Sequence, residues 1–106
     1  MANFVELERP RQVAPGRGIR VTIAEHCAVA LFSVDGRMFA IDDLCVRCGT
    51  SLADGTLSGA SVSCSGCDWQ YDVTNGCVND IPALRIDTFE TKVIGSHILI
   101  ALTASF

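Results

Sequence analysis

Apolar residues in this chain recur in short runs that are typical of β-strands. Helical periodicity, in which apolar residues lie three and four positions apart, is almost absent. The runs are rich in Val, Ile, Leu and Phe, and they cover residues 21–23, 28–34, 38–41, 62–64, 70–73, 89–94 and 98–102. This pattern predicts a mostly β protein built from short strands.

Turn signals separate several of these runs. Asp-Gly at 35–36 lies between two apolar runs, and this dipeptide favours a two-residue hairpin turn because it tolerates positive φ. Asn-Gly at 75–76 gives a second such signal, and Gly-Ser at 95–96 predicts a third hairpin. Residues 10–18 predict a loop before the first long strand. Short strands joined by tight turns indicate a small antiparallel sandwich or barrel.

Four of the six cysteines form two Cys-x-x-Cys pairs, Cys45 with Cys48 and Cys64 with Cys67, with 15 residues between the pairs. This spacing is typical of tetrahedral thiolate metal sites, because each pair can place two sulfurs on one ion. Gly49 follows the first pair and Gly66 lies inside the second, and we expect both to give their turns the conformational freedom they need. The sequence therefore predicts one metal centre held by four thiolates.

The cysteine loops lie in the middle of the chain, between predicted strands. We therefore expect residues 42–74 to form a small metal-binding lobe that carries both loops. Residues 1–41 and 75–106 would form a base of strands. The whole chain of 106 residues is enough for one domain with a modest core.

Composition and charge narrow the class of protein. The net charge is −4 and Lys92 is the single lysine, which argues against a nucleic-acid partner because phosphate binding needs clustered cations. No apolar run approaches the roughly 18 residues that a membrane helix needs. The first ten residues do not show a charged segment followed by an apolar one. We therefore expect a cytoplasmic protein whose thiols stay reduced and bind metal rather than form structural disulfides.

The residues around the two pairs resemble the Rieske-type ferredoxin family, and the resemblance covers nearly the whole chain. That family shows Cys-x-His-x-Gly-x-x-Leu and then Cys-x-x-His-Gly-x-x-Phe-Asp. The positions that match are Cys45, Gly49, Leu52, Cys64, Tyr71 and Asp72, with Tyr in place of Phe. The resemblance implies a Rieske-like antiparallel β-sandwich or barrel base with the metal-binding lobe at one end.

The chain departs from this family at the two histidine positions. Arg47 stands at the first, with Cys48 one residue later, and Cys67 stands at the second. Asp68 replaces the glycine of the second motif. In the family two Cys hold one iron and two His hold the other. A Rieske centre with two imidazole ligands is therefore excluded at these positions.

Three centres remain compatible with four thiolates. A single iron ion of the kind in rubredoxin and a single zinc ion both use two such turns, and a four-Cys [2Fe–2S] cluster is the alternative. The shift to Cys-x-x-Cys in the first motif makes the two turns symmetric, which favours a single ion of iron or zinc. Ligand type alone does not choose between iron and zinc. The only histidines, His26 and His97, are not expected to be ligands.

The function depends on the metal. With iron, we expect a small electron-transfer protein rather than a stand-alone catalyst, and the resemblance implies a reductase or oxygenase that docks at the metal-bearing tip. With zinc, the protein would be a redox-silent module that binds a partner. Arg47, Asp68 and Trp69 lie beside the cysteines, as candidates for supporting the ligands or contacting that partner.

A thiol–disulfide enzyme is the third interpretation. A Cys-x-x-Cys pair at the start of a helix has a lowered thiol pKa, as such an enzyme needs. Neither pair here precedes a helical pattern, so this interpretation is the weakest. No catalytic constellation such as Ser-His-Asp is present in the pattern. Cys27 and Cys77 are expected to pack in the fold, with a spare reactive thiol as the alternative for Cys77.

Replacing one proposed ligand tests the four-cysteine assignment. Cys48→Ser should lose the metal and unfold at a lower temperature, because one of four thiolates is removed. Cys27→Ala should keep the metal. Elemental analysis and thermal unfolding measure both effects, and full metal content in Cys48→Ser would contradict the assignment.

Overall fold

The structure, a computed structural model, describes residues 4–8, 16–24, 27–94 and 97–105. Within these ranges the chain forms strands and one short 3-10 helix, η1 (Leu52–Asp54). No helix in the described ranges has the length and apolar character needed to cross a membrane. The strands are β1 (Phe4–Glu8), β2 (Gly18–Ala24), β3 (Cys27–Val34), β4 (Arg37–Asp42), β5 (Thr56–Ser58), β6 (Ser61–Ser63), β7 (Gln70–Asp72), β8 (Cys77–Val78), β9 (Ile81–Arg85), β10 (Thr88–Ile94) and β11 (His97–Ser105).

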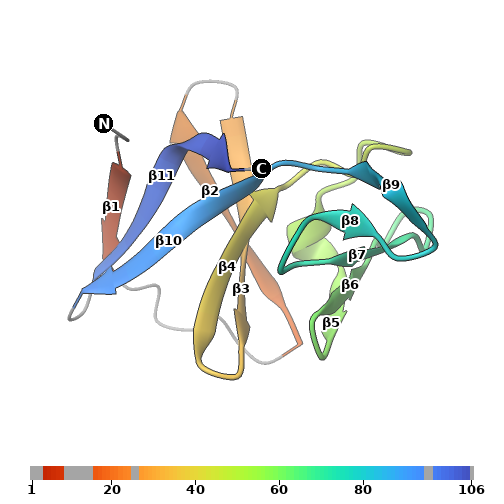
Figure 1. Ribbon diagram of the computed structural model, residues 1–106, viewed down its shortest axis with the longest axis horizontal. Helices are drawn as coiled ribbons and strands as arrows, with labels where there is room; N and C mark the ends of the chain where they lie inside the picture. The colour runs from red at the N-terminus through yellow and green to blue at the C-terminus, as the bar shows by residue number, and fades with distance from the viewer. Residues whose placement is uncertain (1–3, 9–15, 25–26, 95–96, 106) are drawn as a thin grey trace.

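The strands form two antiparallel sheets that lie beside each other (Figure 1). The first sheet has six strands in the order β1-β11-β10-β4-β3-β2, and the second has five in the order β5-β6-β7-β8-β9. All seven predicted apolar runs overlap strands, and the runs 62–64 and 70–73 each extend one residue beyond theirs, which confirms the mostly β fold. β8 and β9 extend the second sheet to Arg85, beyond the residues 42–74 of the expected lobe. The division into base and lobe stays a prediction.

β3 explains why its sequence is apolar almost without interruption. Ala30 and Phe32 on one face belong to a buried cluster that reaches into the second sheet. Val29 and Leu31 on the other face pack in a separate cluster with residues of β10 and β11. Because both faces are buried, the strand does not alternate between apolar and polar residues as a strand with one exposed face would.

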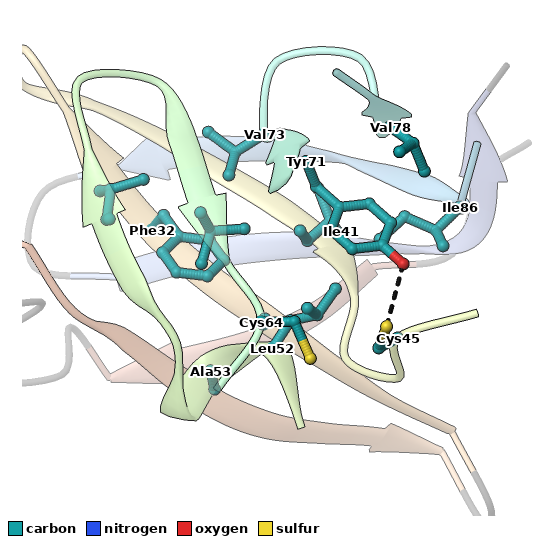
Figure 2. Close-up of a cluster of buried hydrophobic side chains, with 13 residues drawn as sticks. Phe32, Ile41, Cys45, Leu52, Ala53, Cys64, Tyr71, Val73, Val78 and Ile86 are labelled. Carbon is teal, nitrogen blue, oxygen red and sulfur yellow. Dashed lines mark hydrogen bonds between the residues drawn. The ribbon is translucent and has the colours of Figure 1, made fainter. Parts of the chain in front are cut away.

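The first of these clusters joins the two sheets and is drawn in Figure 2. It contains side chains from β3 and β4, from the second sheet and from the segments between strands. Two of the predicted metal-binding cysteines lie within it. Its buried members are Ala30, Phe32, Ile41, Cys45, Leu52, Ala53, Leu57, Val62, Cys64, Tyr71, Val73, Val78 and Ile86.

The turn predictions have different outcomes. Asp35 has φ 51° and Gly36 has φ 82° between β3 and β4, as a two-residue hairpin with positive φ requires. Gly76, with φ 79°, lies in the turn between β7 and β8. The predicted turn at 95–96 lies outside the described residues, as does most of the loop at 10–18. The described end of that loop is Gly16-Arg17, because Gly18 already belongs to β2.

Four strands lie outside the predicted runs. β5 and β8 have three and two residues, too short for a period of two to be recognised. β9 contains Pro82, which signals a break, yet it lies at an edge of the second sheet, where a strand can tolerate proline. β1 pairs with β11 at the edge of the first sheet.

Backbone hydrogen bonds hold the second sheet against the first. The amide of Asp42, at the end of β4, donates to the carbonyl of Asp87 over 2.8 Å. This bond joins the place where the chain leaves the first sheet to the place where it returns. The amide of Leu57 on β5 donates to the carbonyl of Gly16 over 2.9 Å, just before β2. With the shared apolar cluster, these bonds fix the orientation of the second sheet.

Two glycine substitutions test the packing between these segments. A Cβ on Gly76 would lie 2.3 Å from the carbonyl oxygen of Ile86, whereas a Cβ on Gly36 would meet nothing within 4 Å. Both residues have positive φ, so Gly36→Ala measures the backbone cost alone, about 1 kcal/mol. Gly76→Ala adds the clash and should cost about 3 kcal/mol or more. Urea unfolding measures both, and equal costs would contradict this packing.

Candidate metal centre

The first Cys-x-x-Cys loop is a tight turn closed by two backbone hydrogen bonds. The amide of Cys45 donates to the carbonyl of Thr50 over 3.0 Å, and the amide of Gly49 donates to the carbonyl of Cys45 over 3.0 Å. Gly49 has φ 74°, a conformation that side chains other than hydrogen disfavour. The turn therefore depends on the glycine that follows the second cysteine.

The second loop repeats this geometry 19 residues later (45 to 64). The amide of Cys64 donates to the carbonyl of Trp69 over 2.8 Å, and the amide of Asp68 donates to the carbonyl of Cys64 over 2.9 Å. Asp68 takes the place of Gly49 and has φ 62°, which explains why the family motif carries glycine at this position. The two loops are thus equivalent residue by residue. The positive φ of the second loop lies at Asp68 and not at the expected Gly66, so that expectation was wrong.

The structure brings together the four cysteines that the sequence indicates. One sulfur from each of Cys45, Cys48, Cys64 and Cys67 lies within 4.8 Å of all the others. Sγ of Cys45 lies 3.7 Å from Sγ of Cys67, and Sγ of Cys48 lies 3.4 Å from Sγ of Cys64. The close pairs therefore join one loop to the other. All four are free thiols.

The first cysteine of each loop is buried and is surrounded by hydrogen-bond donors. The amide of Gly66 donates to Sγ of Cys64 over 3.4 Å. Burial nevertheless raises the pKa of Cys64 to about 12. Burial also acts to raise the pKa of Cys45, but the Tyr71 hydroxyl and the amides of Cys48 and Arg47 outweigh it and lower that pKa.

The second cysteine of each loop lies nearer the surface. Cys48 is exposed, and the side chain and amide of Thr50 lower its pKa to about 6. Cys67 is half-buried. The amide of Trp69 acts to lower the pKa of Cys67, but burial and the neighbouring sulfurs outweigh it and raise that pKa. Thr50 and Trp69 hold equivalent places in the two loops, so the same amide contact recurs at both outer sulfurs.

Tyr71 supplies a buried hydroxyl to this site. Tyr71 is fully buried, and its hydroxyl oxygen lies 3.1 Å from Sγ of Cys45 (Figure 2). The same oxygen accepts the amide proton of Val46 over 3.1 Å, so the hydroxyl proton is directed to the sulfur. Burial, and then the bond to Cys45, raise the pKa of Tyr71 and keep the phenol protonated. The family motif has Phe here, so the substitution itself is the signal in the sequence for an added donor.

Asp43 holds the first loop in place through hydrogen bonds to its carboxylate. It is buried, with 1% of its surface exposed, and its Oδ1 accepts hydrogen bonds from the Ser51 hydroxyl over 2.8 Å and the Ala53 amide over 3.0 Å. The carboxylate thereby ties the end of β4 to η1, on either side of the loop. The sequence does not indicate this role for Asp43. A run of two aspartates before a cysteine gives no signal that one of them is buried.

The residues beside the cysteines take different positions. The Arg47 guanidinium lies 5.2 Å from the centre of the Trp69 ring, a cation–π contact between the two loops. Trp69 is half-buried and packs against the apolar cluster, together with Cys67. Leu44 and Val46 on the first loop are 56% and 52% exposed. A role in supporting the ligands or contacting a partner stays a prediction for Arg47, Asp68 and Trp69.

Of the remaining cysteines and histidines, only Cys77 has a described side chain, and it is not among the gathered sulfurs. Cys77 is half-buried at the start of β8. Cys27 begins β3 and His97 begins β11, but their side chains are outside the described part of the chain, and so is the whole of His26. The packing role expected for Cys27 stays a prediction. Among described side chains, sulfur is the only ligand type gathered at the site.

Comparison with known proteins gives this fold a family. Residues 3–90 match the family described as the Rieske [2Fe-2S] domain. The chain belongs to this family. A relative, the ferredoxin component of the p-cumate 2,3-dioxygenase system of Pseudomonas putida, is 35% identical over 106 residues, covering 98% of this chain and 90% of that protein. The ferredoxin component of the naphthalene 1,2-dioxygenase system of Pseudomonas aeruginosa is 29% identical over 93 residues, covering 87% and 88%.

Solved structures share the Rieske fold with this chain. Sphingomonas yanoikuyae B1 ferredoxin matches with a TM-score of 0.84 at 24% identity, covering 95% of this chain and 100% of that chain. A chain in the complex of reduced oxygenase and oxidized ferredoxin in carbazole 1,9a-dioxygenase matches with a TM-score of 0.86 at 22% identity, covering 97% and 96%. These structures agree with the fold, and the match over residues 3–90 together with the 35% identical relative confirms the family resemblance expected from the sequence.

Removing one hydroxyl tests the support of the buried sulfur. Tyr71→Phe leaves the ring in the core but takes away the acceptor of the Val46 amide and the donor to Cys45. We expect a loss of about 1–2 kcal/mol of unfolding free energy in the metal-loaded protein. Chemical denaturation measures this loss, with metal content determined alongside. Unchanged stability would show that water replaces the hydroxyl at no cost.

Proposed function

We propose that Cys45, Cys48, Cys64 and Cys67 hold a single metal ion, and that with iron the protein is a small electron-transfer component. The observation that carries the proposal is the equivalence of the two loops, which directs four sulfurs to one point within 4.8 Å of one another. Two equivalent loops of this kind form a clamp for one ion.

The sulfur spacing supports one ion rather than two. Four sulfurs placed tetrahedrally around a metal at about 2.3 Å lie about 3.8 Å from one another. The two close pairs, at 3.7 Å and 3.4 Å, agree with that spacing. A [2Fe–2S] cluster would instead hold its ligands as two pairs, separated by the length of the sulfide-bridged iron pair. The family's own centre also needs two imidazoles, and the described site supplies none.

The donors around the sulfurs suit a redox centre. Bound iron would supply reversible one-electron chemistry. The Gly66 amide and the Tyr71 hydroxyl donate to the two buried sulfurs and offset their negative charge. Such hydrogen bonds raise a reduction potential, because they stabilise the more negative, reduced state.

The relatives support a place in an electron-transfer chain. The p-cumate and naphthalene relatives are ferredoxin components of dioxygenase systems, and the carbazole structure is a complex of an oxygenase with a ferredoxin. We therefore propose a reductase or oxygenase as the partner. The exposed Leu44 and Val46 lie on the loop that carries Cys48, and apolar residues at the tip favour contact with a protein surface.

The second candidate is a redox-silent zinc module of the same fold. The equivalent loops favour zinc as much as iron, since both ions accept four thiolates in a tetrahedron. In that case the same tip would bind a partner without passing electrons to it. The four-Cys [2Fe–2S] cluster is the third candidate and keeps the family's cofactor without its histidines.

Metal analysis of anaerobically purified protein separates these candidates. We expect one iron per chain, no acid-labile sulfide and a visible absorption band that bleaches on reduction. Two irons with two sulfides would replace the single ion by a cluster. Colourless protein that holds one zinc, and that stays colourless when expressed with excess iron, would overturn the electron-transfer proposal.

A further inference from the structure

The two equivalent loops are covered in different ways by their neighbours. The third residue of each turn lies against the sixth residue of the other turn. On one side this pair is Arg47 and Trp69, whose guanidinium and ring lie 5.2 Å apart. On the other side it is Gly66 and Thr50. One flank of the centre therefore carries two large side chains, and the opposite flank carries a glycine and a threonine.

The glycine on the small flank is required by its neighbours. A Cβ on Gly66 would overlap the Thr50 hydroxyl and would lie 3.0 Å from Sγ of Cys48. The backbone of the second loop is therefore in close approach to the outer sulfur of the first. No side chain can be added there to cover that sulfur without displacing Thr50.

The exposure of the two outer cysteines follows this difference. Cys48, on the small flank, is exposed, and the Thr50 hydroxyl lies 3.2 Å from its sulfur. Cys67, beside Trp69 on the large flank, is half-buried and packs against the apolar cluster. A site that is symmetric in its backbone is thus open at one sulfur.

We propose that Cys48 is the ligand that faces the redox partner and that Thr50 positions and tunes it by donating its hydroxyl proton to the sulfur. This inference rests on the proposed function. In the thiol form that the structure describes, Cys48 donates its proton to the Thr50 oxygen. A metal-bound thiolate has no proton, so in the loaded protein the hydroxyl must turn to become the donor and the sulfur becomes the acceptor. Only an electron crosses between the partner's cofactor and this centre, the partner supplies or accepts it, and no covalent bond forms or breaks.

Thr50 suits this role because its backbone is also fixed. Its carbonyl accepts the amide of Cys45, which closes the first turn and holds the Thr50 backbone beside Cys48. Its equivalent in the second turn, Trp69, has no hydroxyl to offer Cys67. Of the two outer sulfurs, only that of Cys48 therefore has a side-chain hydroxyl in the sixth position of its own turn.

The first experiment measures the reduction potential of the iron-loaded protein. Thr50→Val keeps the shape but loses the donor, and it should lower the potential while the visible spectrum stays that of a four-thiolate centre. Thr50→Ser should keep the potential near that of the parent chain. Thr22→Val, an exposed threonine of β2, is the matched control and should change nothing. An unchanged potential in Thr50→Val would overturn the tuning role.

The second experiment compares the two outer sulfurs by alkylation of the metal-loaded protein with iodoacetamide. The thiolate displaces iodide and forms a thioether, and peptide mass spectrometry reports the label at each cysteine separately. Cys48 should be labelled before Cys67, because reactivity follows thiolate character and exposure. Label on Cys67 first, or on both at the same rate, would overturn the proposal.

Opening the large flank extends this comparison. Arg47→Ala removes the guanidinium over Trp69 and should raise the labelling rate of Cys67 relative to Cys48. Arg37→Ala removes a similar contact, 5.7 Å from the Phe39 ring on the hairpin of β3 and β4, and should leave the ratio unchanged. Labelling works with zinc or iron. If the purified protein holds only zinc even when expressed with excess iron, the electron carrier is refuted, and first labelling at Cys48 would still support the open sulfur.

Discussion

The structure depends on how two sulfurs are accommodated inside an apolar cluster. Cys45 and Cys64 are buried among the side chains that join the two sheets, where a thiolate is costly unless donors offset its charge. The Gly66 amide supplies one donor and the Tyr71 hydroxyl supplies another. The tight turns therefore do more than place ligands, because they also aim backbone N–H groups at the sulfurs. Core packing and metal site are built from the same residues.

This arrangement shows how a family can keep its fold while its ligands change. The chain keeps the two sheets and the positions of the first cysteine of each loop, but it replaces both histidines of the family motif. The first loop gains one residue between its ligands, so that Cys48 rather than residue 47 reaches the site. That single shift makes the first turn equivalent to the second. The freed position holds Arg47, which stacks over Trp69 instead.

Much of this could be predicted from the sequence, for reasons that particular residues show. Cysteine spacing predicted the four gathered sulfurs, and the run in β3 predicted a strand because burial of both faces leaves an uninterrupted apolar pattern. The roles of Asp43 and Thr50 could not be predicted. Each depends on a contact across the loop whose direction is set by the backbone turn, and short polar side chains are common in any loop. β9 was missed because proline in an edge strand carries the same signal as proline in a loop.

The hydrogen bonds from Asp42 to Asp87 and from Leu57 to Gly16 have a consequence for how such a protein would work. They tie together the two crossings between the sheets and join β5 to the segment before β2, so a rotation of one sheet against the other would have to break them. A centre mounted in this way cannot swing from a donor to an acceptor while the body stays docked. The whole molecule would have to dissociate from the donor, reorient and bind the acceptor. The rate of electron shuttling would then be limited by diffusion and by the lifetime of each complex.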